Sequence, residues 1–171
     1  LKKTEGYWPD VNKSRELAKK LLAEAGQSNL SFVLSNRAVD QPYKVVGTWL
    51  IDQWKQVGLK VDQQVNPTPL FYDILRKQKT FDVSIDFNCQ SMVNPIADVS
   101  KFLPGGGSNY AEFTDAKTTE LYDQLARAGS VADQKRLIQA LEKRVLDENA
   151  SQMITLWWYK INPYRSYVKG W

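Results

Sequence analysis

Apolar residues change between helix and strand spacing along the first half of the chain. Helical spacing predicts a helix over residues 10–25, with Asp10 at its start and Gly26 after its end, and two more helices that begin near Pro42 and Thr68. Period-two alternation predicts three strands, at residues 30–34, 59–65 and 81–87. Because helices and strands alternate, we expect right-handed βαβ units and a largely parallel sheet.

The helix after Pro42 carries a broad apolar side that includes Trp49, Leu50 and Trp54. A tryptophan on the apolar side of a helix packs most often in the core, so we expect both tryptophans there. The short helix from Thr68 should turn three apolar residues inward, namely Phe71, Ile74 and Leu75.

The second half of the chain has a different pattern. After a glycine-rich break, helical spacing predicts helices over residues 115–128 and 131–148, and Ser130 with Asp133 resembles a capping box. The connection between the two helices is tight, so they should pack antiparallel. Residues 153–159 then have the pattern of a strand. The predicted fold class is α/β, a mostly parallel sheet flanked by helices, with a helical pair before the last strand.

A polar loop follows the strand predicted over residues 81–87. In open α/β sheets, ligands bind at loops beyond the carboxyl ends of strands. This position makes the loop our first candidate for ligand contacts, although an ordinary polar loop would have the same composition. The candidate contacts in the loop are Asn88, Cys89, Gln90, Ser91, Met92 and Asn94.

Composition excludes several classes of function. The net charge is +4, and basic residues are interspersed with acidic ones, which argues against a nucleic-acid partner. The chain contains no histidine and one cysteine, which removes the commonest general base and most transition-metal sites. We therefore expect no metal, no cofactor and no enzymatic activity.

Five segments, in this order, resemble one family. They are LAKKLLAEAG, LIDQWKQVGLKVDQQV, FDVSIDFN, DQKRLIQALEKRVLDE and ITLWWYKINPYRSYVKGW. Their collinear order is similar to that of the bacterial extracellular solute-binding proteins of the peptide, nickel and oligosaccharide class (family 5). These proteins are receptors of ABC importers, and no single segment is diagnostic of them.

The resemblance implies that residues 1–171 form a single C-terminal lobe of a larger, two-lobed protein with a periplasmic-binding-protein fold of class II type. The expected function is capture of a small ligand, a peptide, peptide conjugate or oligosaccharide, in a cleft between the lobes. The implied partners are this ligand, the ABC permease subunits and the missing N-terminal lobe. The implied location is periplasmic, or extracellular and membrane-associated in a Gram-positive source.

In peptide-binding members of this family, an aspartate in the matching loop pairs with the amino terminus of the peptide, and the nearest match here is Ser91. A hydroxyl cannot neutralise a buried ammonium, so a neutral, hydroxyl-rich or anionic ligand is favoured. Trp157, on a strand face opposite Trp158, is a candidate aromatic contact or a core residue.

Two aspartates on the strand predicted over residues 81–87 leave an alternative open. Asp82 and Asp86 could act as acid and base of a carboxylate-based hydrolase. A solvent-facing or helix-capping polar face is the interpretation we favour, with Asp86 as a secondary ligand contact. A protein-interaction domain without a small ligand is the other alternative.

Overall fold

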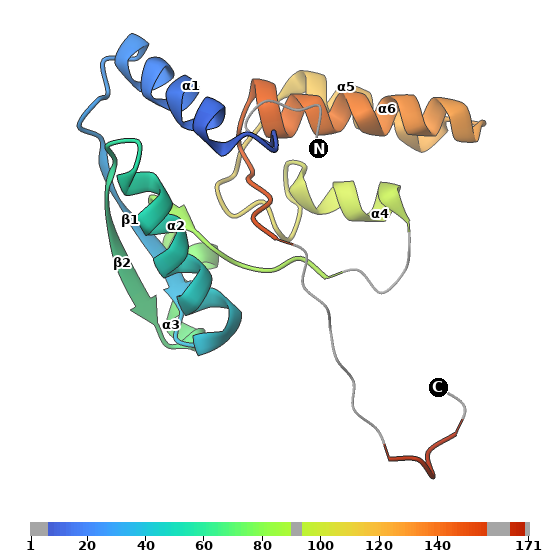
Figure 1. Cartoon of the computed structure of the whole chain (residues 1–171). Helices are drawn as coiled ribbons and strands as arrows, with labels where there is room; N and C mark the ends of the chain where they lie inside the picture. The colour runs from blue at the N-terminus through green and yellow to red at the C-terminus, as the bar shows by residue number, and fades with distance from the viewer. Residues whose placement is uncertain (1–6, 90–93, 157–164, 170–171) are drawn as a thin grey trace.

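The computed structural model describes residues 7–89, 94–156 and 165–169. A sheet with three helices forms one part of the molecule, and a group of helices forms the other (Figure 1). The elements, in chain order, are α1 (Val11–Glu24), β1 (Ser31–Arg37), α2 (Val45–Lys55), β2 (Lys60–Asn66), α3 (Thr68–Asp73), β3 (Val83–Ser84), α4 (Pro95–Val99), α5 (Ala116–Arg127) and α6 (Val131–Lys143).

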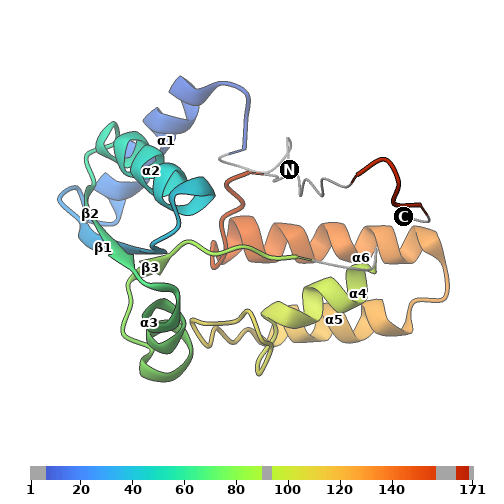
Figure 2. The ribbon, with the colours of Figure 1, turned by 90° about the horizontal axis from the view of Figure 1, so that it is seen from below.

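The three strands form a parallel sheet in the order β2-β1-β3. β1 pairs with β2 along its whole length, from Ser31↔Lys60 to Arg37↔Asn66. α2 lies over one face of the sheet and α3 lies on the opposite side (Figure 2). The core beneath α2 is built from Leu34, Ile51 and Val61, so the predicted parallel α/β arrangement is confirmed.

β3 is much shorter than the alternation over residues 81–87 predicts. It pairs with β1 only through Leu34↔Val83 and Ser35↔Ser84. Before this pairing, the carboxylate of Asp82 accepts a hydrogen bond from the backbone N–H of Val33 at 2.9 Å. The Val33 N–H is therefore bonded to a side chain and not to the backbone of a neighbouring strand, so residue 82 is not part of β3.

The predicted burial on α3 and its extension is confirmed. Phe71 and Leu75 are fully buried and Ile74 is nearly so. The helix continues past α3 through Ile74–Gln78, and Tyr72, Phe81 and Tyr110 pack against this second cluster.

The expectation that Trp49 lies in the core is wrong. Trp49 is 55% exposed, whereas Trp54 packs edge-on against Phe32 with ring centroids 5.3 Å apart. The reason is the close approach of α2 to the sheet at Gly47, where a Cβ atom would meet the side-chain nitrogen of Gln63 at 2.7 Å. This contact turns the side of α2 that carries Trp49 to solvent.

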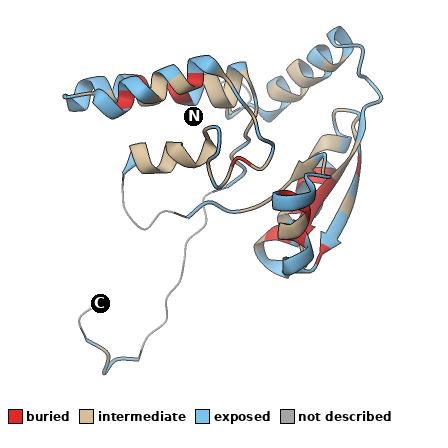
Figure 3. Ribbon diagram, turned by 180° about the vertical axis from the view of Figure 1, so that it is seen from behind, coloured by how far each residue is buried: buried red, intermediate tan, exposed pale blue. Residues whose placement is uncertain are grey.

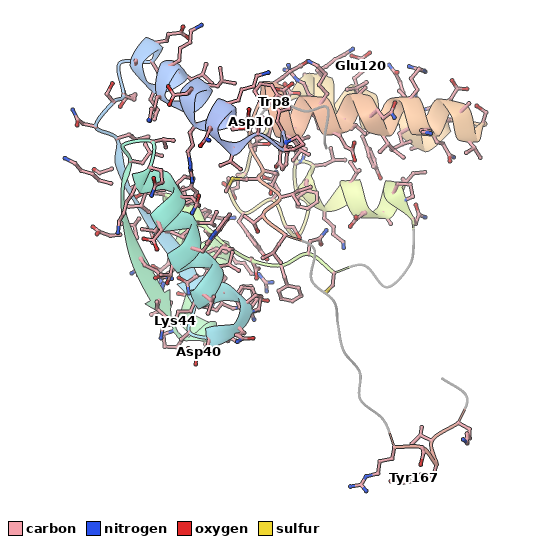
Figure 4. The ribbon with its side chains drawn as sticks, viewed as in Figure 1. Trp8, Asp10, Asp40, Lys44, Glu120 and Tyr167 are labelled. Atoms are coloured by element: carbon pink, nitrogen blue, oxygen red, sulfur yellow. The ribbon has the colours of Figure 1, made fainter. Side chains whose placement is uncertain are left out.

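The start of α2 also differs from the prediction. Residues Asp40–Lys44 form a wide turn in which Gln41 has a non-helical backbone, so the regular helix begins at Val45 rather than at Pro42. Asp40 and Lys44 form an ion pair on this turn (Figure 4).

α1 and α6 begin with the caps that the sequence predicts, and α5 begins with a cap of the same kind. Asp10 accepts from the N–H of Lys13, and Asp115 accepts from the N–H of Thr118. Ser130 accepts from the N–H of Asp133 at 3.1 Å, and its hydroxyl donates to the Asp133 carboxylate at 2.7 Å. These short-range hydrogen bonds fix where each helix begins.

α5 and α6 pack side by side, and Figure 2 shows them antiparallel, as predicted. Leu125, Leu137 and Leu141 form their buried core, and Ile96 and Val99 of α4 pack against it. Buried residues thus gather in two places, on the sheet and between these helices (Figure 3). The helix of α6 continues through Arg144–Glu148.

The last predicted strand is not formed in its described part. Residues 153–156 have no strand geometry, and the sheet contains β2, β1 and β3 alone among the described residues. Instead, the N–H of Ile154 donates to the hydroxyl of Tyr7 at 2.9 Å, which brings two distant segments together. Residues 157–159 of the prediction lie outside the described residues.

Across the described residues, no helix combines the length and the apolar character needed to cross a membrane.

Candidate functional site

Two oppositely charged side chains meet where neighbouring strands end. Arg37 is the last residue of β1, and Asp86 follows β3, which pairs with β1. The Nε atom of Arg37 lies 3.9 Å from Oδ1 of Asp86, and the two side chains are only 14% and 10% exposed. Because both strands are parallel, this pair lies at the carboxyl edge of the sheet, where ligands bind in open α/β folds.

Two tyrosines hold the carboxylate of Asp86. The hydroxyl of Tyr72, on α3, donates to Oδ1 at 3.3 Å, and the hydroxyl of Tyr110 donates to Oδ2 at 3.2 Å. Burial, and then the negative charge of Asp86, raise the pKa of Tyr72. The interpretation of Asp86 as part of a solvent-facing polar face is therefore wrong, because its side chain is 10% exposed and accepts hydrogen bonds from the two tyrosine hydroxyls.

Aromatic rings surround the guanidinium of Arg37. Its central carbon lies 4.1 Å from the ring centroid of Tyr43, 5.2 Å from that of Phe87 and 5.6 Å from that of Tyr72. Burial raises the pKa of the Tyr43 hydroxyl. We call these residues the Arg37–Asp86 cluster, whose members are Arg37, Tyr43, Tyr72, Asp86, Phe87 and Tyr110.

Arg76 adds a second positive charge beside the cluster. Its guanidinium carbon lies 4.3 Å from the ring centroid of Tyr72 and 5.8 Å from that of Tyr110. Interaction with the Tyr110 hydroxyl raises the pKa of Arg76. Among the described residues, no carboxylate forms an ion pair with Arg76.

Buried polar side chains form hydrogen bonds with one another next to this edge of the sheet. Oδ1 of Asn36 accepts from Nε2 of Gln63 at 3.0 Å, and Nδ2 of Asn66 donates to the Ser35 hydroxyl at 3.1 Å. Ser35, Asn36 and Asn66 are buried. Satisfied polar pairs of this kind fix the positions of the strand ends from which the cluster projects.

The polar loop is tied to α4 by the side chain of Lys101. Its ammonium donates to Oδ1 of Asn88 at 3.1 Å and to the carbonyl of Cys89 at 2.8 Å. Asn88 also donates to the carboxylate of Asp98 at 3.0 Å. Cys89, one of the candidate contacts, is exposed.

Asn94, another predicted contact, caps α4. Its Oδ1 accepts from the N–H groups of Ile96 and Ala97 at 3.0 and 3.3 Å. Gln90, Ser91, Met92 and Trp157 lie outside the described residues. The role of the loop in ligand contact therefore stays a prediction. The cluster beside it is a second candidate site, of which the sequence pattern singled out Asp86 alone.

Two small hollows lie on the sheet side of the molecule. One of about 140 Å³ is lined by Val33, Ser35, Gln64, Thr80, Phe81 and Asp82. The other, of about 180 Å³, adjoins Phe81 and Asp82 and is lined further by Lys79, Tyr110, Ala111 and Glu112. Both are smaller than the roughly 300 Å³ or more of a typical ligand pocket. Within the described ranges, no three acidic, cysteine or histidine side chains gather as metal ligands do.

Comparisons with known proteins place this geometry in context. No family model matches the sequence, and no curated protein matches it. Solved structures do match. The unliganded open form of MppA, a periplasmic murein tripeptide binding protein, superposes with a TM-score of 0.75 at 18% identity, over 85% of this chain and 30% of its own.

The chain has the fold of part of a solute-binding protein.

Two other solved structures agree with this fold. The substrate-binding domain of an oligopeptide ABC transporter from Bacillus anthracis matches over 82% of this chain and 27% of its own, at 20% identity and a TM-score of 0.67. NikA from Staphylococcus aureus, in complex with Ni(L-His)2, matches over 77% and 30%, at 17% identity and a TM-score of 0.65. The predicted fold of the solute-binding class is thus confirmed, and the chain spans less than a third of the length of these proteins.

Proposed function

We propose that this chain is one lobe of the solute-binding component of an ABC import system. The observation that carries the proposal is the superposition on open MppA, a binding protein, with the Arg37–Asp86 cluster at the carboxyl edge of the matched sheet. A binding role suits this cluster better than catalysis, because Asp86 is occupied by an arginine and two tyrosine hydroxyls.

The chemistry of the edge supports a small ligand with polar and apolar parts. Arg76 offers a positive charge, and the half-exposed ring of Phe87 offers apolar surface. A peptide, or a peptide conjugate with an anionic group, presents both kinds of group. Gln90, Ser91, Met92 and Trp157 remain proposed contacts.

We propose that the ligand is enclosed between this lobe and a second lobe that closes over it. The hollows of about 140 and 180 Å³ support this, because each is too small to enclose a ligand by itself. The hydrogen bond between Ile154 and Tyr7 holds two distant segments side by side, as a hinge between lobes requires.

The partners that follow are the ligand, the N-terminal lobe and the permease subunits of the importer. The proposed location is the periplasm, or the outer face of the membrane in a Gram-positive source.

Native mass spectrometry of the longer, two-lobed protein tests this proposal. We expect the purified protein to carry a small molecule, or to bind one from libraries of peptides, oligosaccharides and metal chelates. A protein that stays empty against all three libraries would favour an interaction domain without a small ligand.

The isolated chain gives a second test. With one lobe absent, a ligand keeps much of its solvent exposure and loses about half of its contacts, so binding should be weak. Tight binding to these 171 residues alone, measured by calorimetry, would contradict the two-lobe mechanism.

A further inference from the structure

Both ends of the polar loop after β3 are attached to α4 and its continuation. The loop begins at Asn88 and Cys89, where the ammonium of Lys101 donates to the Asn88 side chain at 3.1 Å and to the Cys89 carbonyl at 2.8 Å. The loop ends at Asn94, whose side chain caps the first turn of α4. The same helical segment therefore holds the start and the end of the loop, and Lys101 provides the attachment at the start.

The backbone that carries Lys101 is itself held in place. Lys101 lies in the turn Ser100–Phe102, which continues α4, and α4 packs against the buried core between α5 and α6. The carbonyl of Lys101 accepts from the N–H of Ser108 at 3.0 Å. Gly106 passes so close to this carbonyl that a Cβ atom there would clash with it. The ammonium of Lys101 therefore reaches the loop from a fixed starting point.

The amide of Asn88 has only one orientation that satisfies both of its neighbours. The ammonium of Lys101 can only donate, so it must face Oδ1 of Asn88. The carboxylate of Asp98 can only accept, so it must face Nδ2, which lies 3.0 Å away. Because an amide has two N–H groups and two acceptor positions, Asn88 can still offer one of each to a ligand while it is held in this way.

Lys101 differs from an ordinary surface lysine. Lys117 forms an ion pair with Glu120 at the i,i+3 spacing, as Lys101 does with Asp98. The side chain of Lys117 is 53% exposed, whereas that of Lys101 is 25% exposed. Fixing a long side chain costs conformational entropy, and a surface ion pair alone offsets little of it. The contacts that hold Lys101 are therefore those to the start of the loop.

We propose that Lys101 is a positioning residue of the proposed binding site, which holds the start of the polar loop in place and the amide of Asn88 in one orientation before a ligand is bound. This inference rests on the proposed function. It adds a residue outside the loop that raises affinity without ligand contact, because a loop that is ordered in advance loses less freedom on binding.

NMR relaxation of the ¹⁵N-labelled chain tests the proposal through the order parameter of the Cys89 backbone N–H. We expect about 0.85 in the parent chain and less than about 0.6 in Lys101→Met, which keeps the length of the side chain but removes the donors. Lys117→Met is the matched control and should leave Cys89 ordered. Lys101→Arg keeps a positive charge with N–H donors, so it should return the order parameter toward the parent value.

The proposal is overturned if Lys101→Met leaves Cys89 as ordered as in the parent chain, or disorders it no more than Lys117→Met does. It is also overturned if β3 and α4 lose order together with Cys89, because Lys101 would then stabilise the fold in general. An order parameter in Lys101→Arg as low as that in Lys101→Met would likewise contradict the role of the charged donor.

Binding by the two-lobed protein gives a second readout. In native mass spectrometry against a peptide library, Lys101→Met should bind about threefold to tenfold more weakly than the parent protein, and Lys117→Met should bind as the parent does. Equal binding by Lys101→Met would overturn the proposal. A parent protein that binds no peptide would count against the proposed function alone, because the order parameters judge the positioning role in the chain itself.

Discussion

Asp86→Ala should destabilise the fold strongly, because it leaves the charge of Arg37 buried without its partner. Removing one member of a fully buried ion pair costs about 3 to 5 kcal/mol. Here the closest nitrogen–oxygen distance is 3.9 Å and the side chains keep 14% and 10% exposure, so the loss of the ion pair by itself costs less than this range. With the loss of an acceptor for Tyr72 and Tyr110, we expect a loss of about 2 to 3 kcal/mol.

Urea unfolding, followed by far-ultraviolet circular dichroism and tryptophan fluorescence, measures this loss. Asp62→Ala is the matched control, since Asp62 is an exposed aspartate on β2 and its loss should change the free energy of unfolding by less than about 0.5 kcal/mol. In an Arg37→Met background the effect of Asp86→Ala should shrink by about 1 kcal/mol or more. If Asp86→Ala costs no more than the control, or if the two effects simply add, the pair does not stabilise the fold as we infer.

Three further predictions concern other parts of the fold. Asp82→Ala should lower the free energy of unfolding by about 1 kcal/mol and speed hydrogen exchange at the backbone amide of Val33, which donates to Asp82. Unchanged exchange at this amide would show that the Asp82 carboxylate does not stabilise β1. Trp54→Ala should cost about 2 to 3 kcal/mol in thermal or urea unfolding, and Trp49→Ala less than about 0.5, whereas equal losses would contradict the orientation of α2. Arg144 holds the pKa of Asp115 well below its usual range, so the pair stabilises the fold above about pH 4 and this stability is lost as the pH falls. Arg144→Gln should therefore flatten the dependence of stability on pH between about pH 5 and pH 2, and a curve parallel to that of the parent chain would argue against the pair.

The predicted contacts and the Arg37–Asp86 cluster only partly overlap. The sequence pointed to the chain beyond β3, because a polar loop after a strand is visible in the pattern. It did not reveal the roles of Arg37, Tyr72 and Tyr110, which are far from Asp86 in the sequence. One signal was available: Arg37 follows the strand predicted over residues 30–34 and Asp86 lies near the end of the strand predicted over residues 81–87, and parallel strands end at the same edge of a sheet.

The starts of α1, α5 and α6 were determined by the local sequence. Asp10, Asp115 and Ser130 cap their helices through hydrogen bonds to N–H groups three residues away. Such contacts involve residues close together in the sequence, so the local sequence pattern predicts them. The parallel order of the strands followed in the same way, from the alternation of helix and strand along the chain.

Only the tertiary structure decided which apolar residues became core and which charged residues met. Apolar residues surround much of α2, so its pattern fits several orientations, and the close approach at Gly47 selects the one that buries Leu50 and Ile51 and exposes Trp49. The meeting of Arg37 with Asp86 likewise depends on the pairing of β1 with β3. Contacts of this kind form between segments that are distant in sequence, and no local pattern records them.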